Sequence, residues 1–236
     1  MADERVERSE LPPEADSVAP ASVPTPPVLE HEPAAAAALF GDRIDLARSY
    51  TASLAEHGET LGLIGPRELP QLWSRHILNS ALLAPLLHGR VGDVGSGAGL
   101  PGLVLAIARP DVSMTLIEPM ERRTDWLQSE VHRMGLDNVE VLRARAEELP
   151  GSGRLLPLDQ VTARAVSALR TLIPLTAPLV RSGGELILMK GGRAEEEITA
   201  AQKVIRKHRL HEVTVQELGA EHGLDTTRVV RAIVDP

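Results

Sequence analysis

Apolar side chains recur at helical spacing from Ala34 to about Leu87, in two segments. The first has Leu39, Ile44, Leu46, Tyr50 and Leu54, and Gly58 lies just past its expected end. The second runs from about Leu69 to Leu87, with Leu72, Trp73, Ile77, Leu78, Leu82 and Leu83 on one side. The pattern predicts an amino-terminal helical cap over residues 34–88.

From Arg90 onward the pattern changes to short β-branched runs that alternate with helical segments, as in parallel strands joined by helical crossovers. The expected strands are Val91 to Val94, Ser113 to Glu118, Val139 to Leu142, Gln160 to Ala163 and Glu185 to Met189. The expected helices between them are Pro101 to Ala108, Arg122 to Met134 and Leu169 to Val180.

The end of the chain has no further crossover. After a helix at Ala194 to His208, two apolar runs, Glu212 to Leu218 and Thr227 to Val234, are separated only by a short linker, which predicts an antiparallel hairpin at the sheet edge. Five parallel strands with an antiparallel terminal pair are typical of a class I S-adenosylmethionine-dependent methyltransferase, whereas a dinucleotide-binding Rossmann fold keeps its last strand parallel. We therefore expect a Rossmann-like α/β methyltransferase domain over residues 89–236.

The first 33 residues differ in composition from the rest. They hold seven prolines, and eight acidic residues against two arginines, which predicts a disordered tail over residues 1–33. Most of the net charge of -8 therefore lies in the tail. The remaining chain is nearly neutral, so it can still present a basic face to RNA.

Several classes of protein are excluded by what the sequence lacks. It has no cysteine, which excludes disulfides, thiolate metal sites and a cysteine nucleophile. No run approaches the roughly 18 apolar residues of a membrane span, and the charged amino end does not resemble a secretory signal. We expect a cytoplasmic protein, monomeric and without a metal site.

A glycine-rich loop, Asp93-Val-Gly-Ser-Gly-Ala-Gly99, follows the first expected strand and opens a helix, where glycine lets the backbone approach a ligand. From Gly97 to Gly102 the same loop also matches the dinucleotide fingerprint Gly-x-Gly-x-x-Gly. A carboxylate at Asp93 would repel a pyrophosphate and attract the sulfonium and ammonium groups of S-adenosylmethionine. The loop therefore favours S-adenosylmethionine, bound by Asp93, Gly95 and Gly97, over the alternative of an NAD-linked oxidoreductase.

Three more candidate site residues lie at the ends of later strands. Glu118 ends the second strand, where an acid can accept hydrogen bonds from both ribose hydroxyls, in NAD enzymes as well as in methyltransferases. Arg164 follows the fourth strand at the carboxyl edge of the sheet, where its forked guanidinium could hold a carboxylate or RNA. Lys190 closes the fifth strand at the same edge.

The residues that the chain lacks narrow the choice of methyl acceptor. Methylation of pyrimidine C5 generally needs a cysteine, and adenine N6 enzymes carry an Asn/Asp-Pro-Pro-aromatic turn where this chain has Ala163-Arg164-Ala165. The N7 atom of guanine presents a bare lone pair, so its methylation needs alignment and exclusion of water but no general base. Other intrinsically nucleophilic acceptors, and an RNA-binding module without catalysis, remain alternatives.

Four segments together resemble the RsmG family, formerly called GidB, which methylates guanine N7 in 16S ribosomal RNA. They are Leu-Trp-Ser-Arg-His-Ile-Leu-Asn-Ser at 72–80, Val-Gly-Asp-Val-Gly-Ser-Gly-Ala-Gly-Leu-Pro-Gly at 91–102, Ala-Arg-Ala at 163–165 and Met-Lys-Gly-Gly at 189–192. The likeness runs from about Leu39 to Val234. It implies S-adenosylmethionine as cofactor and 16S ribosomal RNA, or the small ribosomal subunit, as partner.

The resemblance also implies roles for single residues. Those at the cofactor would be Gly95, Leu100, Ala146, Glu147 and Arg164, with Glu118 near the ribose. Those facing the RNA or the methyl-transfer pocket would be Arg75, His76, Asn79 and Lys190, although His76 could equally pack under the sheet. Arg164 is the expected catalytic residue, and its replacement by alanine is expected to leave the fold intact because an edge residue carries little packing.

Overall fold

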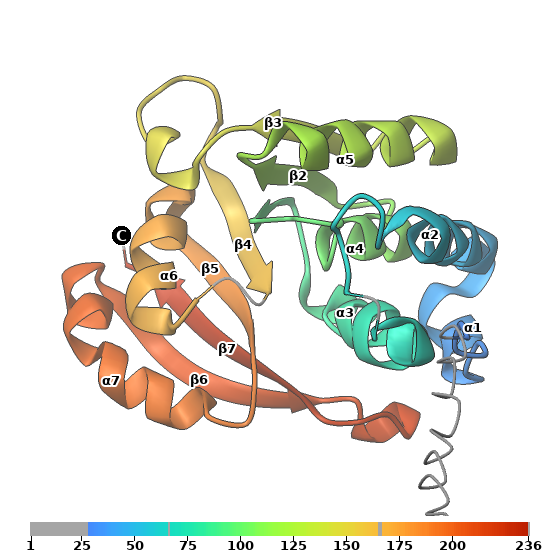
Figure 1. Cartoon of the computed structure of the whole chain (residues 1–236). Helices are drawn as coiled ribbons and strands as arrows, with labels where there is room; N and C mark the ends of the chain where they lie inside the picture. The colour runs from blue at the N-terminus through green and yellow to red at the C-terminus, as the bar shows by residue number, and fades with distance from the viewer. Residues whose placement is uncertain (1–27, 66, 165–166, 236) are drawn as a thin grey trace, which may run out of the picture.

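The computed structural model describes residues 28–65, 67–164 and 167–235, which form a seven-stranded sheet between two helical layers (Figure 1). The strand order is β3-β2-β1-β4-β5-β7-β6. The strands are β1 Arg90–Val94, β2 Ser113–Glu118, β3 Val139–Arg143, β4 Leu158–Arg164, β5 Val180–Lys190, β6 Leu210–Leu218 and β7 Thr227–Val234. Strands β1 to β5 are parallel, and β7 pairs antiparallel with both β5 and β6, which confirms the predicted fold class and terminal hairpin.

The helices divide between the two faces of the sheet (Figure 1). They are α1 Ala35–Phe40, α2 Ile44–His57, α3 Asn79–Ala81, α4 Gly102–Ala108, α5 Glu121–Met134, α6 Leu169–Thr176 and α7 Ala194–Lys207. The alternation along β5 shows the division: Ile187 joins the core under α4, α5 and the cap, while Leu186 and Leu188 join the core under α6 and α7.

The segment between β4 and β5 contains a shorter helix than the one expected over Leu169 to Val180, which the sequence shows interrupted by Pro174 and Pro178. Helix α6 ends at Thr176, a short 3₁₀ turn covers Ala177–Leu179, and β5 already begins at Val180 instead of Glu185. Pro178 explains this early end, because proline removes a backbone donor and clashes with the preceding helical turn, whereas Pro174 lies inside α6.

The second cap segment is not a continuous α-helix. It is a 3₁₀ turn at Leu69–Gln71, a π-helix at Leu72–Leu78, the short helix α3, and a 3₁₀ turn at Ala84–Leu86. A π-helical stretch is rare and often occurs at functional sites, because the wider turn redirects side chains and backbone carbonyls. This stretch carries Arg75 and His76, and α3 begins with Asn79.

The amino-terminal cap packs into the same hydrophobic core as α4 and α5, so the boundary between cap and catalytic domain at residues 88 and 89 stays a prediction. Of the tail expected over residues 1–33, residues 1–27 lie outside the described part of the chain. Residues 28–33 contact the cap: Glu30 accepts a 2.9 Å hydrogen bond from the Ser74 amide, and Glu32 pairs with Arg48 at 2.6 Å.

Within the described ranges every helix is too short or too polar to cross a lipid bilayer.

Candidate active site at the carboxyl edge of the sheet

The glycine loop after β1 has the left-handed backbone that only glycine adopts without strain. The φ angles of Gly95, Gly97 and Gly99 are 74°, 56° and 104°. A Cβ atom built on Gly97 would meet only the Gly95 carbonyl oxygen within 4 Å, at 3.8 Å, so the loop is open above Gly97. The loop therefore offers a bare backbone surface that a ligand can approach closely.

Two aromatic side chains fix this loop from behind. The Tyr50 hydroxyl and the Trp126 indole N–H both donate to the Ala98 carbonyl oxygen, at 2.9 and 2.8 Å. Burial raises the pKa of Tyr50 well above its ordinary value, so the hydroxyl stays a donor. Neither residue was predicted from the sequence to belong to the site. The available signal was that the chain has only one Tyr and two Trp, and the polar atom of such a side chain usually finds a partner when buried.

Glu118 lies beside the loop at the end of β2 and is 2% exposed. Its Oε2 accepts from the Gly97 amide and its Oε1 from the Met120 amide, each at 3.0 Å. Each carboxylate oxygen can accept a second hydrogen bond. The geometry fits a carboxylate that holds two adjacent ribose hydroxyls above the loop.

Asp93 lies under the loop and is fully buried. Its Oδ2 accepts a 3.0 Å hydrogen bond from the Gly102 amide at the start of α4, and burial raises its pKa to about 7. A carboxyl group that is partly protonated and bound to its own backbone does not present a full charge to a ligand. Asp93 therefore attracts the positive groups of S-adenosylmethionine less than expected, and its contact with the cofactor stays a prediction.

Gly102, the third glycine of the dinucleotide fingerprint, has a packing role. A Cβ atom at this position would overlap the side chains of Leu116 and Asp93. Glycine is thus required where α4 packs on the sheet, whichever nucleotide the loop binds.

Arg164, at the end of β4, is bound to the cap by four hydrogen bonds. Nη1 donates to the His76 carbonyl at 3.2 Å and to Ser80 Oγ at 3.1 Å; Nη2 donates to the Arg75 carbonyl at 3.0 Å and to His76 Nδ1 at 2.6 Å. Burial lowers the pKa of Arg164 from its very high ordinary value. Arg164 therefore joins the sheet to the cap, so the assumption that this edge residue carries little packing is wrong, and the effect of its replacement on the fold stays a prediction.

His76 is neutral in this arrangement. Arginine can only donate, so His76 Nδ1 must accept and the ring proton lies on Nε2, which donates to Glu68 at 2.5 Å. Burial lowers the pKa of His76, which favours the same form. His76 therefore lies between Arg164 and Glu68 inside the cap, and its expected contact with RNA stays a prediction.

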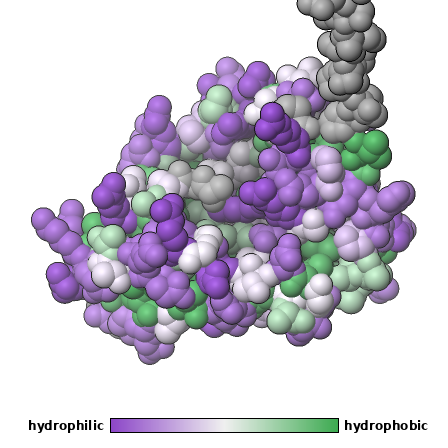
Figure 2. Space-filling view, turned by 60° about the horizontal axis from the view of Figure 1, so that its bottom comes forward, coloured by the Kyte–Doolittle hydropathy of each residue, from purple (hydrophilic) through white to green (hydrophobic). Residues whose placement is uncertain are grey.

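A cavity of about 530 Å³ lies beside Arg164, where β4 and β5 end. It is lined by Arg75, Asn79, Arg164, Ser167, Met189, Lys190, Gly191, Glu197, Thr226 and Thr227. The view of the lower side of the molecule, where these strands end, shows mostly hydrophilic residues (Figure 2). Four of the predicted site residues, far apart in the sequence, line this one cavity: Arg75, Asn79, Arg164 and Lys190.

The remaining predicted cofactor residues lie on the loops that follow β1 and β3. Leu100 is partly buried in the glycine loop, while Ala146 and Glu147 begin a 3₁₀ turn after β3, with Ala146 buried and Glu147 exposed. All three follow the carboxyl ends of parallel strands. Their contact with the cofactor remains a prediction.

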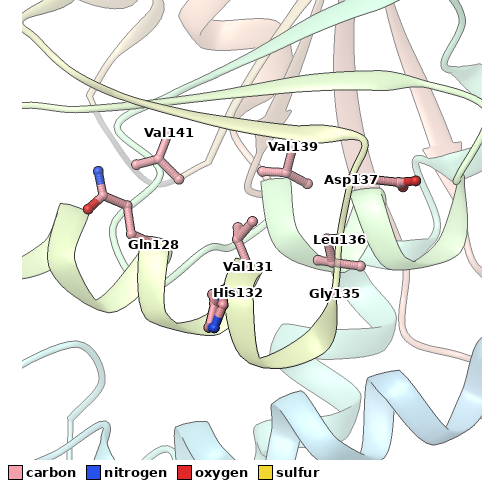
Figure 3. Close-up of a pocket in the computed structure, with 8 residues that line it drawn as sticks. All are labelled: Gln128, Val131, His132, Gly135, Leu136, Asp137, Val139 and Val141. Atoms are coloured by element: carbon pink, nitrogen blue, oxygen red, sulfur yellow. The ribbon is translucent and has the colours of Figure 1, made fainter.

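A second cavity, of about 490 Å³, lies between α5 and the edge strand β3. Figure 3 shows Val131 from the helix facing Val139 and Val141 from the strand. None of the predicted site residues lines this groove.

Comparison with solved structures supports the fold. The cofactor-bound protein Rv0187 from MTB matches with a TM-score of 0.53 and 17% sequence identity, over 80% of this chain and 89% of that one. Protein Atu636 from Agrobacterium tumefaciens, described as a predicted O-methyltransferase, matches with a TM-score of 0.51 and 22% identity, over 68% and 80%. At these identities the likeness shows the fold alone.

Sequence comparison identifies the family. The family model of rRNA small subunit methyltransferase G, GidB, matches residues 43–226. Proteins named Ribosomal RNA small subunit methyltransferase G are 62% identical in Clavibacter michiganensis subsp. michiganensis, over 90% of this chain and all of that protein, and 63% identical in Leifsonia xyli subsp. xyli, over 87% and 98%. The chain therefore belongs to the rRNA small subunit methyltransferase G (GidB) family.

Proposed function

We propose that this protein transfers a methyl group from S-adenosylmethionine to N7 of a guanine in 16S ribosomal RNA. The observation that carries the proposal is the cavity at the carboxyl edge, because the cap, β4 and β5 each contribute a residue to it from the segments typical of the family. Ligands of open α/β sheets bind at this edge, which supports the same location for the chemistry.

The glycine loop and Glu118 fit the cofactor. Open backbone above Gly97 leaves room for the ligand, and the carboxylate of Glu118 can accept hydrogen bonds from a ribose. Ala146 and Glu147, after β3, would lie at the adenine. Arg164 would hold the carboxylate of the methionine part through Nε–H, because its four Nη–H donors are used on the cap.

The reaction asks for alignment more than for acid or base catalysis. S-Adenosylmethionine supplies an electrophilic methyl group on a positively charged sulfur. The N7 lone pair of guanine is free at neutral pH, so no side chain has to remove a proton before transfer. The residues around the cavity would hold the base in line with the methyl group and exclude water.

An NAD-linked oxidoreductase is disfavoured. Its main support was the Gly-x-Gly-x-x-Gly spacing, and Gly102 is required by packing against Leu116 and Asp93 alone. The antiparallel β7 also departs from the dinucleotide-binding sheet.

The test is a methyl-transfer assay. Protein, labelled S-adenosylmethionine and small ribosomal subunits from cells that lack the activity should yield label on guanine N7 of 16S ribosomal RNA. Naked 16S ribosomal RNA in a parallel reaction identifies the preferred substrate. The absence of label from guanine N7 in both reactions would refute the proposal.

We also propose that the protein acts as a monomer in the cytoplasm. Light scattering in the presence and absence of the RNA would test the first point, and cell fractionation the second. A stable dimer, or recovery with membranes, would contradict them.

A further inference from the structure

Two charged side chains that line the 530 Å³ cavity form a pair whose role the proposed methyl transfer does not specify. Lys190 Nζ, at the end of β5, lies 2.9 Å from Glu197 Oε2, in the first turn of α7. The Lys190 side chain is 8% exposed and that of Glu197 is 29% exposed, so the pair lies partly inside the cavity wall.

The hydrogen bonds described for this pair use only one of the two carboxylate oxygens of Glu197. Glu197 Oε2 also accepts from the Leu169 amide at 2.9 Å, and Lys190 Nζ also donates to the Ser167 carbonyl. Within the described part of the chain no hydrogen bond uses Glu197 Oε1, and this oxygen is not among the buried atoms that lack a partner. The lysine has a third N–H donor beyond these two contacts.

Glu197 is held in its ionised form. Burial raises its pKa, but the hydrogen bonds from Lys190 and Leu169 outweigh burial, so the pKa lies below its ordinary value. The cavity wall thus presents an ammonium donor beside a carboxylate that can only accept.

This pattern is complementary to one edge of guanine. Guanine carries the acceptor O6 next to the donors N1–H and N2–H, whereas adenine has a donor amino group where guanine has O6. An adjacent ammonium and carboxylate would therefore match guanine and oppose adenine. Enzymes that modify a base commonly extrude it from the helix and bind its Watson–Crick edge in a pocket.

The order of residues along the edge agrees with the position of N7. Arg164 is paired in register with Met189, next to Lys190, and Glu197 follows on α7. In the sheet β4 lies between β5 and β1, the strand that leads into the glycine loop, so Arg164 lies between that loop and Lys190. In guanine N7 adjoins O6, and O6 adjoins N1, so a base held at O6 by Lys190 and at N1 by Glu197 would have N7 on the side of Lys190 away from Glu197.

We propose that Lys190 and Glu197 are specificity residues: Lys190 donates to O6, and Glu197 Oε1 accepts from N1–H and N2–H of an extruded target guanine. This inference rests on the proposed function and goes beyond it by naming the groups that choose the base. The alternative is that the pair is a structural tether, which only holds α7 against β5.

The experiment combines a change in the enzyme with a change in the base. Once the methylated position is mapped, small subunits are assembled with 16S ribosomal RNA that carries guanosine, inosine or 6-thioguanosine there. Inosine lacks only the N2 amino group, and 6-thioguanosine replaces O6 by a weakly accepting sulfur. The values of kcat/KM are measured for the wild type, Glu197→Gln and Lys190→Met.

The wild type should prefer guanosine over inosine by about tenfold or more, as expected for a lost hydrogen bond to a charged group. Glu197→Gln should lose most of that preference while keeping an acceptor for the Leu169 amide. Lys190→Met should in the same way lose the preference for guanosine over 6-thioguanosine. The comparison of ratios cancels the intrinsic difference in reactivity between the bases.

Glu196→Gln, an exposed neighbour on α7, is the matched control and should keep the wild-type ratios. If Glu197→Gln slows transfer to guanosine and inosine equally, the pair is a structural tether and the inference is overturned. If Glu197→Gln does not fold, unchanged ratios in Lys190→Met overturn it instead. A wild type without activity on guanosine refutes the proposed function itself.

Discussion

Two cavities of this protein are nearly equal in size but different in construction. The groove between α5 and β3, of about 490 Å³, is lined by consecutive elements and mainly by apolar side chains such as Val131 and Val139 (Figure 3). The carboxyl-edge cavity, of about 530 Å³, is lined by charged and polar groups from the cap, β4, β5, α7 and β7. Volume therefore does not identify the site; the convergence of polar groups at the carboxyl ends of the strands does.

The carboxyl-edge cavity is also set apart by charged side chains that are bonded to one another. At the carboxyl edge, Arg164 is bound to His76 and His76 to Glu68, while Lys190 is bound to Glu197. These side chains hold one another in fixed positions, as a site for aligning two reactants requires. The following predictions test this difference, from the largest expected effect on activity to the smallest.

The largest effect is expected for Arg164→Ala. We expect kcat/KM for methylation to fall at least about a hundredfold, because both the cofactor contact and the junction with the cap are lost. Stability should fall by about 1–3 kcal/mol, because His76 Nδ1 and Ser80 Oγ lose a buried donor. Initial rates and denaturant titrations measure the two effects.

Arg164→Lys is the control for charge, because it keeps a cation but loses the fork that reaches four acceptors. It should remain strongly impaired. Turnover unchanged in Arg164→Ala would remove this residue from the site.

A smaller effect is expected for Glu118→Ala. The affinity for S-adenosylhomocysteine should fall about tenfold or more, because the ribose loses its acceptor and the Gly97 and Met120 amides lose theirs. Titration calorimetry measures the dissociation constant. Glu118→Asp, shorter by one methylene, should retain most of the binding, and equal binding by Glu118→Ala and the wild type would contradict the assignment.

Asp93→Asn is expected to change stability with pH more than activity. The pKa of Asp93 is about 7 in the folded protein against 3.8 for the free group, so the folded state binds a proton more tightly than the unfolded state. The protonated Asp93 carboxyl group contributes its full stabilisation below pH 3.8, and this contribution is lost as the pH rises through about 7. The loss is up to about 4 kcal/mol.

The measurement is the free energy of unfolding of the wild type and of Asp93→Asn between about pH 4.5 and 8, which covers most of the interval between the two pKa values. As the pH rises, Asp93→Asn should become more stable relative to the wild type, since asparagine can still accept from the Gly102 amide without titrating. Parallel curves would show that the pKa of Asp93 is not raised.

The smallest effect is expected in the apolar groove. Val139→Thr should leave methylation within about twofold of the wild type, with a stability loss of about 1 kcal/mol. The reverse exchange at the carboxyl-edge cavity, Thr227→Val, removes the partner of the Asn79 amide and should lower kcat/KM more. A loss of activity in Val139→Thr as large as that in Thr227→Val would place the groove in the functional site.

The strands and the terminal hairpin could be predicted because their signals are local. β-Branched runs and helical spacing report burial on one or two faces, and β2 and β7 were predicted to the residue. The π-helix at Leu72–Leu78 was missed, because its apolar spacing is close to that of an α-helix and its wider turn depends on packing. The orientation of Asp93 was missed for a similar reason: a strand position gives the face but not the hydrogen-bond partner.

The sequence by itself determined the five parallel strands with their terminal hairpin, the glycine loop and the family, because each is written in short segments of the chain. Only the tertiary structure decided that Arg164 binds a cap residue 88 positions earlier and that Glu197 joins Lys190 in the wall of the cavity. Such contacts depend on how the crossovers and the cap pack on the sheet. Burial then fixes the hydrogen bonds and the charge of each group, and no local pattern records them.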